Sequence, residues 1–267
     1  MTIPTVVLAI GGFDGSGGAG NLADVRAIQL SGGYPCAIVT ALTAQNTLRV
    51  DRIERVSTEL IRRQFRCLVD DFQIGAIKIG LLPSVACVET LIECLESEKL
   101  NCPIVLDPVM RATSGDALAD VEAIEVLLQG LVPLTTLITP NIAEASKLTN
   151  RSIDHLADAI ASGNQLLRMG CQNVLVKGGH FERDKGTDIW CYQEGYEVFE
   201  PRERQEGTVR GTGCMFASAI ACHLGQGKSV RDAITVSKAL VSHVISEGQS
   251  FGQGTPVTTL GIKDQSF

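Results

Sequence analysis

Short apolar segments alternate with longer amphipathic segments along most of this chain, and this alternation is the feature that most limits how the chain can fold. The short segments are rich in Val, Ile, Leu and Ala, which is the composition of strands buried on both faces. A strand followed by a helix and another strand favours right-handed crossovers in a mainly parallel sheet. We therefore expect an α/β fold with a central, mainly parallel sheet and helices on both of its faces.

The apolar and amphipathic segments give specific expected elements. The predicted strands span residues 5–10, 37–42, 74–79, 104–107, 137–139 and 174–177. The predicted helices span residues 19–30, 58–72, 84–98, 121–128, 153–169, 213–225 and 230–246. Segments 189–192 and 196–199 flank Gln193-Glu194-Gly195, a pattern typical of an antiparallel hairpin at the sheet edge. No linker composition interrupts the 267 residues, so we expect one domain spanning residues 1–267.

Composition argues against several classes of function. The net charge of −7 and the absence of like-charge blocks disfavour nucleic acid as a partner. No apolar run approaches the ~18 residues that a membrane helix needs, and the first residues do not resemble a signal peptide, so we expect a cytoplasmic protein without membrane contact. The nine cysteines include no C-x-x-C pair and the four histidines show no ligand spacing, which disfavours a structural zinc site.

Gly211, Thr212, Gly213 and Cys214, here called the GTGC motif, precede an apolar stretch of helical length. The glycines allow a tight turn and a close approach of a ligand, and the helix directs its free amides and positive dipole end to the same point. The motif is suited to binding phosphate, although glycine turns before helices are also common where nothing binds. The field at the helix start is expected to lower the pKa of Cys214 and favour its thiolate.

A second glycine cluster occupies residues 11–20, directly after the first predicted strand. A strand, a glycine turn and a helix form the local plan of ligand sites at the carboxyl edge of a parallel sheet. The glycine spacing fits neither the dinucleotide fingerprint nor the Walker pattern, so a nucleotide must be held in another way.

Polar residues also follow three later predicted strands, where open α/β sheets bind their ligands. Asp107, Asn141 and Glu144 offer the oxygen ligands that Mg²⁺ prefers, directly or through water. Each position also has a structural interpretation. Asn141 is a candidate helix N-cap with Glu144 at N3, Asp107 before Pro108 is a candidate strand end, and Lys177 is a candidate surface lysine.

Seven motifs occur in order along nearly the whole chain. They are Asp14-Gly15-Ser16-Gly17-Gly18-Ala19-Gly20 with Asp24, Thr40-Ala41-Leu42-Thr43-Ala44-Gln45-Asn46-Thr47, Lys78-Ile79-Gly80-Leu81-Leu82, Leu106-Asp107-Pro108-Val109-Met110, Thr139-Pro140-Asn141 with Glu144, Val176-Lys177-Gly178-Gly179-His180, and the GTGC motif. In this combination the chain resembles the hydroxymethylpyrimidine/phosphomethylpyrimidine kinases of thiamine biosynthesis, within the ribokinase-like superfamily. The resemblance implies a ribokinase-like three-layer α/β/α sandwich, a homodimer, and the use of ATP and Mg²⁺.

The resemblance also implies a reaction and a set of site residues. The chain would phosphorylate a small-molecule pyrimidine, 4-amino-5-hydroxymethyl-2-methylpyrimidine, and then convert its monophosphate to the diphosphate. The implied catalytic residues are Cys214 with Gly211, Thr212 and Gly213. The implied pyrimidine contacts are Asp24, Gln45, Gly12, Leu81 and Val109. The implied nucleotide contacts are Lys177, Thr139 and Asn141, and the implied metal residues are Asp107 and Glu144.

Arg210 departs from the family pattern, in which a histidine commonly precedes the GTGC motif. An arginine is suited to phosphate, so Arg210 is a candidate to bind the monophosphate substrate. Two other functions stay open. A pyridoxal or pyridoxine kinase of the same superfamily is disfavoured by Asp24 and Gln45. A pyrimidine-binding sensor without catalysis is disfavoured by the intact GTGC motif.

Overall fold

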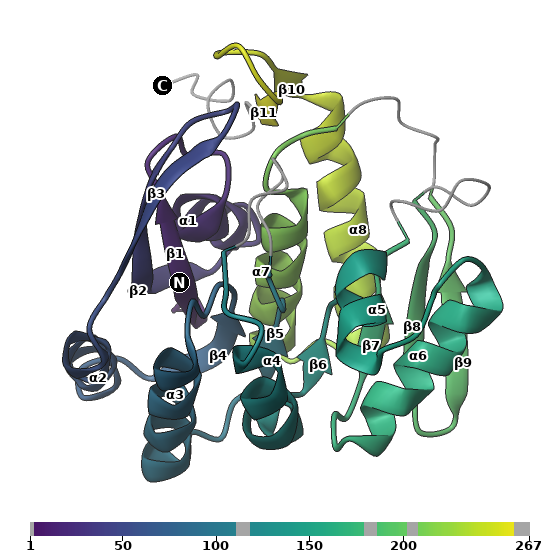
Figure 1. Ribbon diagram of the computed structural model, residues 1–267, viewed down its shortest axis with the longest axis horizontal. Helices are drawn as coiled ribbons and strands as arrows, with labels where there is room; N and C mark the ends of the chain where they lie inside the picture. The colour runs from purple at the N-terminus through teal and green to yellow at the C-terminus, as the bar shows by residue number, and fades with distance from the viewer. Residues whose placement is uncertain (1–2, 111–117, 179–185, 202–207, 259–267) are drawn as a thin grey trace.

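A nine-stranded sheet forms the centre of the computed structural model, which describes residues 3–110, 118–178, 186–201 and 208–258 (Figure 1). The strands lie in the order β3-β2-β1-β4-β5-β6-β7-β8-β9, and a separate two-stranded sheet pairs β10 with β11. The strands are β1 (Val6–Asp14), β2 (Tyr34–Gln45), β3 (Val50–Arg55), β4 (Ile74–Ile79), β5 (Ile104–Leu106), β6 (Leu137–Ile138), β7 (Val174–Val176), β8 (Asp188–Tyr192), β9 (Gly195–Phe199), β10 (Gly248–Gln249) and β11 (Val257–Thr258). The expected α/β class is confirmed.

The six neighbouring strands β2, β1, β4, β5, β6 and β7 pair in parallel. Strand β3 at one edge, and β8 and β9 at the other, pair antiparallel. The hairpin expected at the sheet edge is confirmed as β8 and β9, in which Tyr192 pairs with Gly195. Strand β3 at the opposite edge was not expected from the sequence. Its polar, half-exposed residues lack the apolar pattern of a buried strand.

The helices are α1 (Gly20–Leu30), α2 (Thr58–Val69), α3 (Val85–Glu98), α4 (Ala123–Val126), α5 (Ile142–Thr149), α6 (Leu156–Arg168), α7 (Thr212–Gly225) and α8 (Val230–Ser246). Helix α4 is shorter than expected because the chain continues as a π-helical turn over Leu127–Leu131. In the part of the chain that is described, no helix combines the length and apolarity needed to cross a bilayer.

Alternate residues of the sheet belong to two separate cores. Leu8 and Ile10 of β1 pack in one cluster with residues of α2, α3, α5 and α6. Val7 and Ala9 of the same strand pack in a second cluster with residues of α1, α7 and α8. Strands that are buried on both faces explain the continuous apolar runs of the sequence. The layers are therefore helix, sheet and helix, as the ribokinase-like resemblance implies.

Strand β1 is longer than expected and continues through Gly11 and Gly12 to Asp14. Glycine weakens strands, but β1 continues because it remains paired with β2, with Gly12 opposite Ala41 and Asp14 opposite Thr43. The turn therefore begins after Asp14. This moves the glycine loop to the sheet edge at which β4, β5, β6 and β7 also end.

Candidate active site

The two glycine clusters meet through their backbones. Gly211, the N-cap of α7, has φ +77°, and a Cβ there would lie 2.0 Å from the carbonyl oxygen of Gly18. Gly20 has φ +57°, and its Cβ would lie 2.2 Å from the carbonyl oxygen of Gly12. Only glycine fits such positions, because any side chain would collide with backbone atoms. The start of α7 is thereby pressed against the loop that follows β1.

Cys214 lies in the first turn of α7 and is half-buried. The amides of this turn have no partner within the helix and face the helix end, as the sequence predicts. Burial raises the pKa of the Cys214 thiol to about 12, although the charge of Lys78 acts in the opposite direction. The predicted low-pKa thiolate is therefore wrong. Desolvation, together with the nearby carboxylates of Asp107 and Asp24, outweighs the charge of Lys78.

Lys177 joins the end of β7 to this turn. Its Nζ lies 2.7 Å from Oδ1 of Asp107, and a Cβ on Gly213 would lie 3.3 Å from the same Nζ. Asp107 is buried, and Thr139 Oγ1 lies 3.4 Å from its Oδ1. Burial opposes ionisation of Asp107, but the charges of Lys177 and Lys78 outweigh it and hold its pKa below the usual value. Lys177 is thus a largely buried member of the site, 13% exposed, and the surface interpretation of this lysine is wrong.

Asn141 and Glu144 form a capping box at the start of α5. The backbone N–H of Glu144 donates to Oδ1 of Asn141 at 2.9 Å, and the backbone N–H of Asn141 donates to Oε2 of Glu144 at 2.8 Å. The structural interpretation of this pair is confirmed. Residue 141 also forms a parallel bridge with Lys177, which places the cap beside Asp107. The capping box does not use the second oxygen of Glu144 or the amide nitrogen of Asn141.

The carboxylates of Asp107 and Glu144 fit a divalent cation. Burial raises the pKa of Glu144 to about 7; the charge of Lys177 opposes this rise and the charge of Asp107 adds to it. The two negative charges therefore disfavour each other, and a cation would relieve that repulsion. Within the described ranges no three His, Cys, Asp or Glu side chains gather as ligands around one point. Mg²⁺ is commonly bound by one or two carboxylates with water and substrate phosphates, so this pair is a sufficient protein contribution.

Asp24, which the resemblance implies as a pyrimidine contact, is fully buried in α1. Its Oδ1 accepts from Nζ of Lys78 at 2.7 Å and from Oγ of Ser218 at 2.8 Å. Burial lowers the pKa of Lys78, but Asp24 outweighs it and holds that pKa above the usual range. The pair links α1, β4 and α7 beneath the site. Contact of Asp24 with the pyrimidine stays a prediction.

Lys78 and Ser218 were not predicted as site residues from the sequence. Lys78 belongs to a quoted motif and is the one charged residue in the apolar run 74–79, and a charge inside a buried strand requires a partner. That signal was sufficient to predict a buried pair. Ser218 lies in a mostly apolar helix and gave no comparable signal.

Gly12, Leu81 and Gln45 line the other side of the glycine loop. A Cβ on Gly12 would lie 2.9 Å from Cδ2 of Leu81, so these two predicted pyrimidine contacts touch. Gln45 ends β2, and its Oε1 accepts from Nη2 of Arg210 at 2.6 Å. Arg210 also donates from Nε to Oδ2 of Asp14 at 3.3 Å and is 2% exposed. Its partners in the described chain are thus protein groups, and a role toward phosphate stays a prediction.

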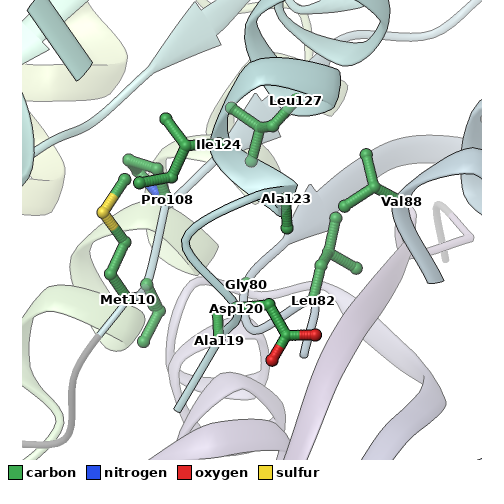
Figure 2. A pocket seen from close by; sticks show the side chains of 11 residues that line it. Gly80, Leu82, Val88, Pro108, Met110, Ala119, Asp120, Ala123, Ile124 and Leu127 are labelled. Carbon is green, nitrogen blue, oxygen red and sulfur yellow. The ribbon is translucent and has the colours of Figure 1, made fainter. Parts of the chain in front are cut away.

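Val109, another predicted pyrimidine contact, lies after β5. It lines a small pocket between α3, α4 and the segment after β5, shown in Figure 2, together with apolar residues such as Leu82 and Met110. The enclosed volume is about 20 Å³, which suffices for about one water molecule. Asp120 is its acidic lining residue and pairs with Arg55 at 2.6 Å. Gly179 and His180 of the sixth motif lie outside the described residues.

Comparison with known proteins places these residues in a family context. Residues 14–259 match the family described as Phosphomethylpyrimidine kinase. The chain is 35% identical over 249 residues to the hydroxymethylpyrimidine/phosphomethylpyrimidine kinase of Aquifex aeolicus, covering 93% of this chain and 97% of that protein.

Solved structures agree with the sequence match. The crystal structure of phosphomethylpyrimidine kinase from Clostridium difficile 630 has a TM-score of 0.79 and 34% identity, covering 90% of this chain and 99% of that one. The ADP complex of Bacillus subtilis pyridoxal kinase has a TM-score of 0.88 and 29% identity, covering 96% and 97%. The family match and the identity to the Aquifex protein lead to one conclusion: the chain belongs to the phosphomethylpyrimidine kinase family.

Proposed function

We propose that this chain transfers the γ-phosphoryl group of ATP to the hydroxymethyl group of 4-amino-5-hydroxymethyl-2-methylpyrimidine, and then phosphorylates the monophosphate to the diphosphate, in thiamine biosynthesis. The observation that carries the proposal is the position of Lys177. Its ammonium group lies against both Asp107 and Gly213 of the GTGC motif. A cation between a carboxylate and a set of free helix amides is suited to a transferring phosphoryl group.

The GTGC amides carry the charge stabilisation in this proposal. Phosphoryl transfer has a loose transition state, in which negative charge on the phosphoryl oxygens matters more than deprotonation of the attacking alcohol. The high pKa of Cys214 agrees with this assignment, because a neutral thiol at pH 7 is a hydrogen-bond donor rather than a base. Cys214 then contacts the reacting atoms as a donor, and the amides of residues 211–214 hold the phosphoryl oxygens.

Asp107 and Glu144 are the residues that would hold Mg²⁺, directly or through water. The ion would neutralise charge on the phosphate groups of ATP. Thr139 and Asn141 lie beside these carboxylates and complete the nucleotide side of the proposed site.

The pyrimidine side of the proposed site consists of Gly12, Leu81 and Gln45, with Val109 at its margin. Gln45 offers an amide that pairs with a ring nitrogen and an exocyclic amine. Asp24 contributes from beneath through Lys78, which stabilises the carboxylates around the GTGC motif. The proposal describes residues 1–267 as one kinase domain that acts as a cytoplasmic homodimer.

A coupled ATP-turnover assay with MgATP tests the function. The pyrimidine alcohol, its monophosphate and pyridoxal are offered separately. We expect turnover on both pyrimidines. Turnover on pyridoxal alone would refute the substrate assignment, and ATP consumption on none of the three would favour the non-catalytic sensor.

Pyridoxal kinase is the second candidate, and one observation favours it. The Bacillus subtilis pyridoxal kinase superposes with a TM-score of 0.88, above the 0.79 of the Clostridium phosphomethylpyrimidine kinase. The sequence identity favours the phosphomethylpyrimidine kinase, because it is 29% to the pyridoxal kinase and 34% to the Clostridium protein. Since one fold hosts several substrates, the residues of the site weigh more than the superposition.

A further inference from the structure

Arg210 is the largest of the fully buried side chains, and four segments of the chain converge on it. Its guanidinium donates to Asp14 at the end of β1 and to Gln45 at the end of β2. Its backbone N–H donates to the carbonyl oxygen of Pro256 at 2.8 Å, and the residue that follows it is Gly211 of the GTGC motif. A buried cation at this crossing touches both the proposed pyrimidine side and the proposed phosphate side.

The loop after β1 holds the guanidinium from one side. Asp14 accepts from the backbone N–H of Ser16 at 2.9 Å and from that of Ala19 at 3.0 Å, so its carboxylate is fixed before it meets Arg210. Gly18 packs closely against the Arg210 side chain, because a Cβ at residue 18 would lie 2.7 Å from Cδ of Arg210. Arg210 thus has little freedom to move away from Gln45.

The chemistry of the guanidinium determines how the amide of Gln45 is oriented. Arginine has donors and no acceptor, so the atom of Gln45 at 2.6 Å from Nη2 is its oxygen. The amide nitrogen, Nε2, therefore points away from Arg210 and is left as a donor. The charged partner also makes this hydrogen bond stronger than one between neutral groups.

We propose that Arg210 is a positioning residue that fixes the amide of Gln45 and thereby selects the substrate. The selected class is a nitrogen heterocycle with a ring nitrogen that accepts from Nε2, next to an exocyclic amine that donates to the remaining lone pair of Oε1. The proposal rests on the proposed function, in which Gln45 contacts the pyrimidine. Nη1 of Arg210 has no partner among the described residues, so the folded chain does not use every donor of this side chain.

Steady-state kinetics on the pyrimidine alcohol test the proposal with Arg210→Met, Gln45→Ala and the double variant. We expect Arg210→Met to raise KM about 10- to 100-fold, as removal of a charge-assisted hydrogen bond does, with kcat nearly unchanged. The double variant is expected to match Gln45→Ala alone, because Arg210 acts through Gln45 and effects in one network are not additive. Arg210→Lys retains a donor and is expected to recover part of the loss.

Arg26→Met is the matched control. Arg26 also donates to the glycine loop, at 3.3 Å from the carbonyl oxygen of Gly17, without contacting Gln45. We expect its KM to stay within about twofold of the wild type, since this half-buried side chain makes its hydrogen bond to the loop backbone and not to Gln45.

Gln45→Glu keeps the test decisive if Arg210→Met does not fold. The carboxylate retains the partnership with Arg210 but removes the donor, so we expect KM to rise at least as far as in Gln45→Ala. An unchanged KM in Gln45→Glu would overturn the proposal. Additive effects of Arg210→Met and Gln45→Ala, or a loss confined to the monophosphate substrate, would also overturn it. A wild-type chain without turnover on either pyrimidine would instead refute the proposed function.

Discussion

Replacing Asp24 with Asn separates two roles for this residue, a direct pyrimidine contact and the counter-ion of Lys78. Both side chains are 0% exposed and their charged atoms lie 2.7 Å apart. The substitution keeps the shape and removes the charge, so Lys78 is left buried without its partner. Breaking a buried ion pair from one side costs about 3–5 kcal/mol, a large part of the ~5–15 kcal/mol that stabilises a typical domain.

Urea unfolding and thermal melting measure this loss. For a chain of this size about 3–5 kcal/mol corresponds to a fall in Tm of roughly 6–20 °C. Glu54→Gln is the matched control, because Glu54 pairs with Arg52 at the surface, where the side chains are 64% and 75% exposed. We expect that control to lose no more than about 1 kcal/mol.

A double variant tests whether the loss of stability comes from the unpaired charge of Lys78. Asp24→Asn with Lys78→Met removes both charges, and we expect it to be more stable than Asp24→Asn alone, since the uncompensated cation is gone. The counter-ion role is refuted if Asp24→Asn unfolds within about 1 kcal/mol of the wild type while its KM for the pyrimidine rises at least tenfold.

Three further variants probe the GTGC motif and the carboxylates. Cys214→Ala is expected to lower kcat at least about tenfold with an unchanged melting curve, and near-normal kcat would remove the thiol from the reaction. Gly211→Ala is expected to lower kcat about 100-fold or more, because its Cβ would lie 2.0 Å from the carbonyl oxygen of Gly18. Gly227→Ala is its control, because Gly227 also has a positive φ of +84° but a Cβ there would have no atom within 4 Å. We expect this control to lose only about 1 kcal/mol of stability. The pKa of Glu144 lies at about 7 in the folded protein against an ordinary 4.5, so its protonation stabilises the fold below about pH 4.5 and that stability is lost as the pH rises through 7. In metal-free buffer we therefore expect Glu144→Gln to gain up to about 3 kcal/mol over the wild type at pH 8.5 relative to pH 4, measured by urea unfolding, and an equal difference at both pH values would contradict the reasoning.

The sequence predicts the parts of this fold in which one pattern dominates. The buried strand β7 has a continuous apolar run, β4 has one interrupted only by Gly75 and Lys78, and the β8–β9 hairpin has its turn residues in place. Strand β3 was missed, and of helix α5 only the candidate N-cap Asn141 was predicted, for different reasons. Strand β3 is a polar edge strand held by pairing with β2, and α5 spans only eight residues, too few for a clear period.

The candidate site also has features that the sequence predicts and features that it does not. The sequence predicts that Asp107 and Lys177 lie at the ends of two buried strands. The sheet brings Nζ of Lys177 to 2.7 Å from Oδ1 of Asp107, although β6 lies between β5 and β7. Charge states follow from three-dimensional burial, so the ionisation of Cys214 was predicted with the wrong sign. The pairing of Arg210 with Gln45 joins residues 165 positions apart, and nothing local in either segment encodes it.

The meeting of the two glycine clusters indicates that the site forms late in folding. The hydrogen bond between Arg210 and Asp14 spans 196 positions of the chain, and Gly211 rests on Gly18 over a similar separation. Such contacts close a very long loop, so we expect them to form after much of the sheet between them has ordered. A chain interrupted before α7 lacks the amides that we propose to bind phosphate. Recovery of turnover during refolding therefore reports completion of the whole molecule, whereas recovery of helix signal reports only its parts.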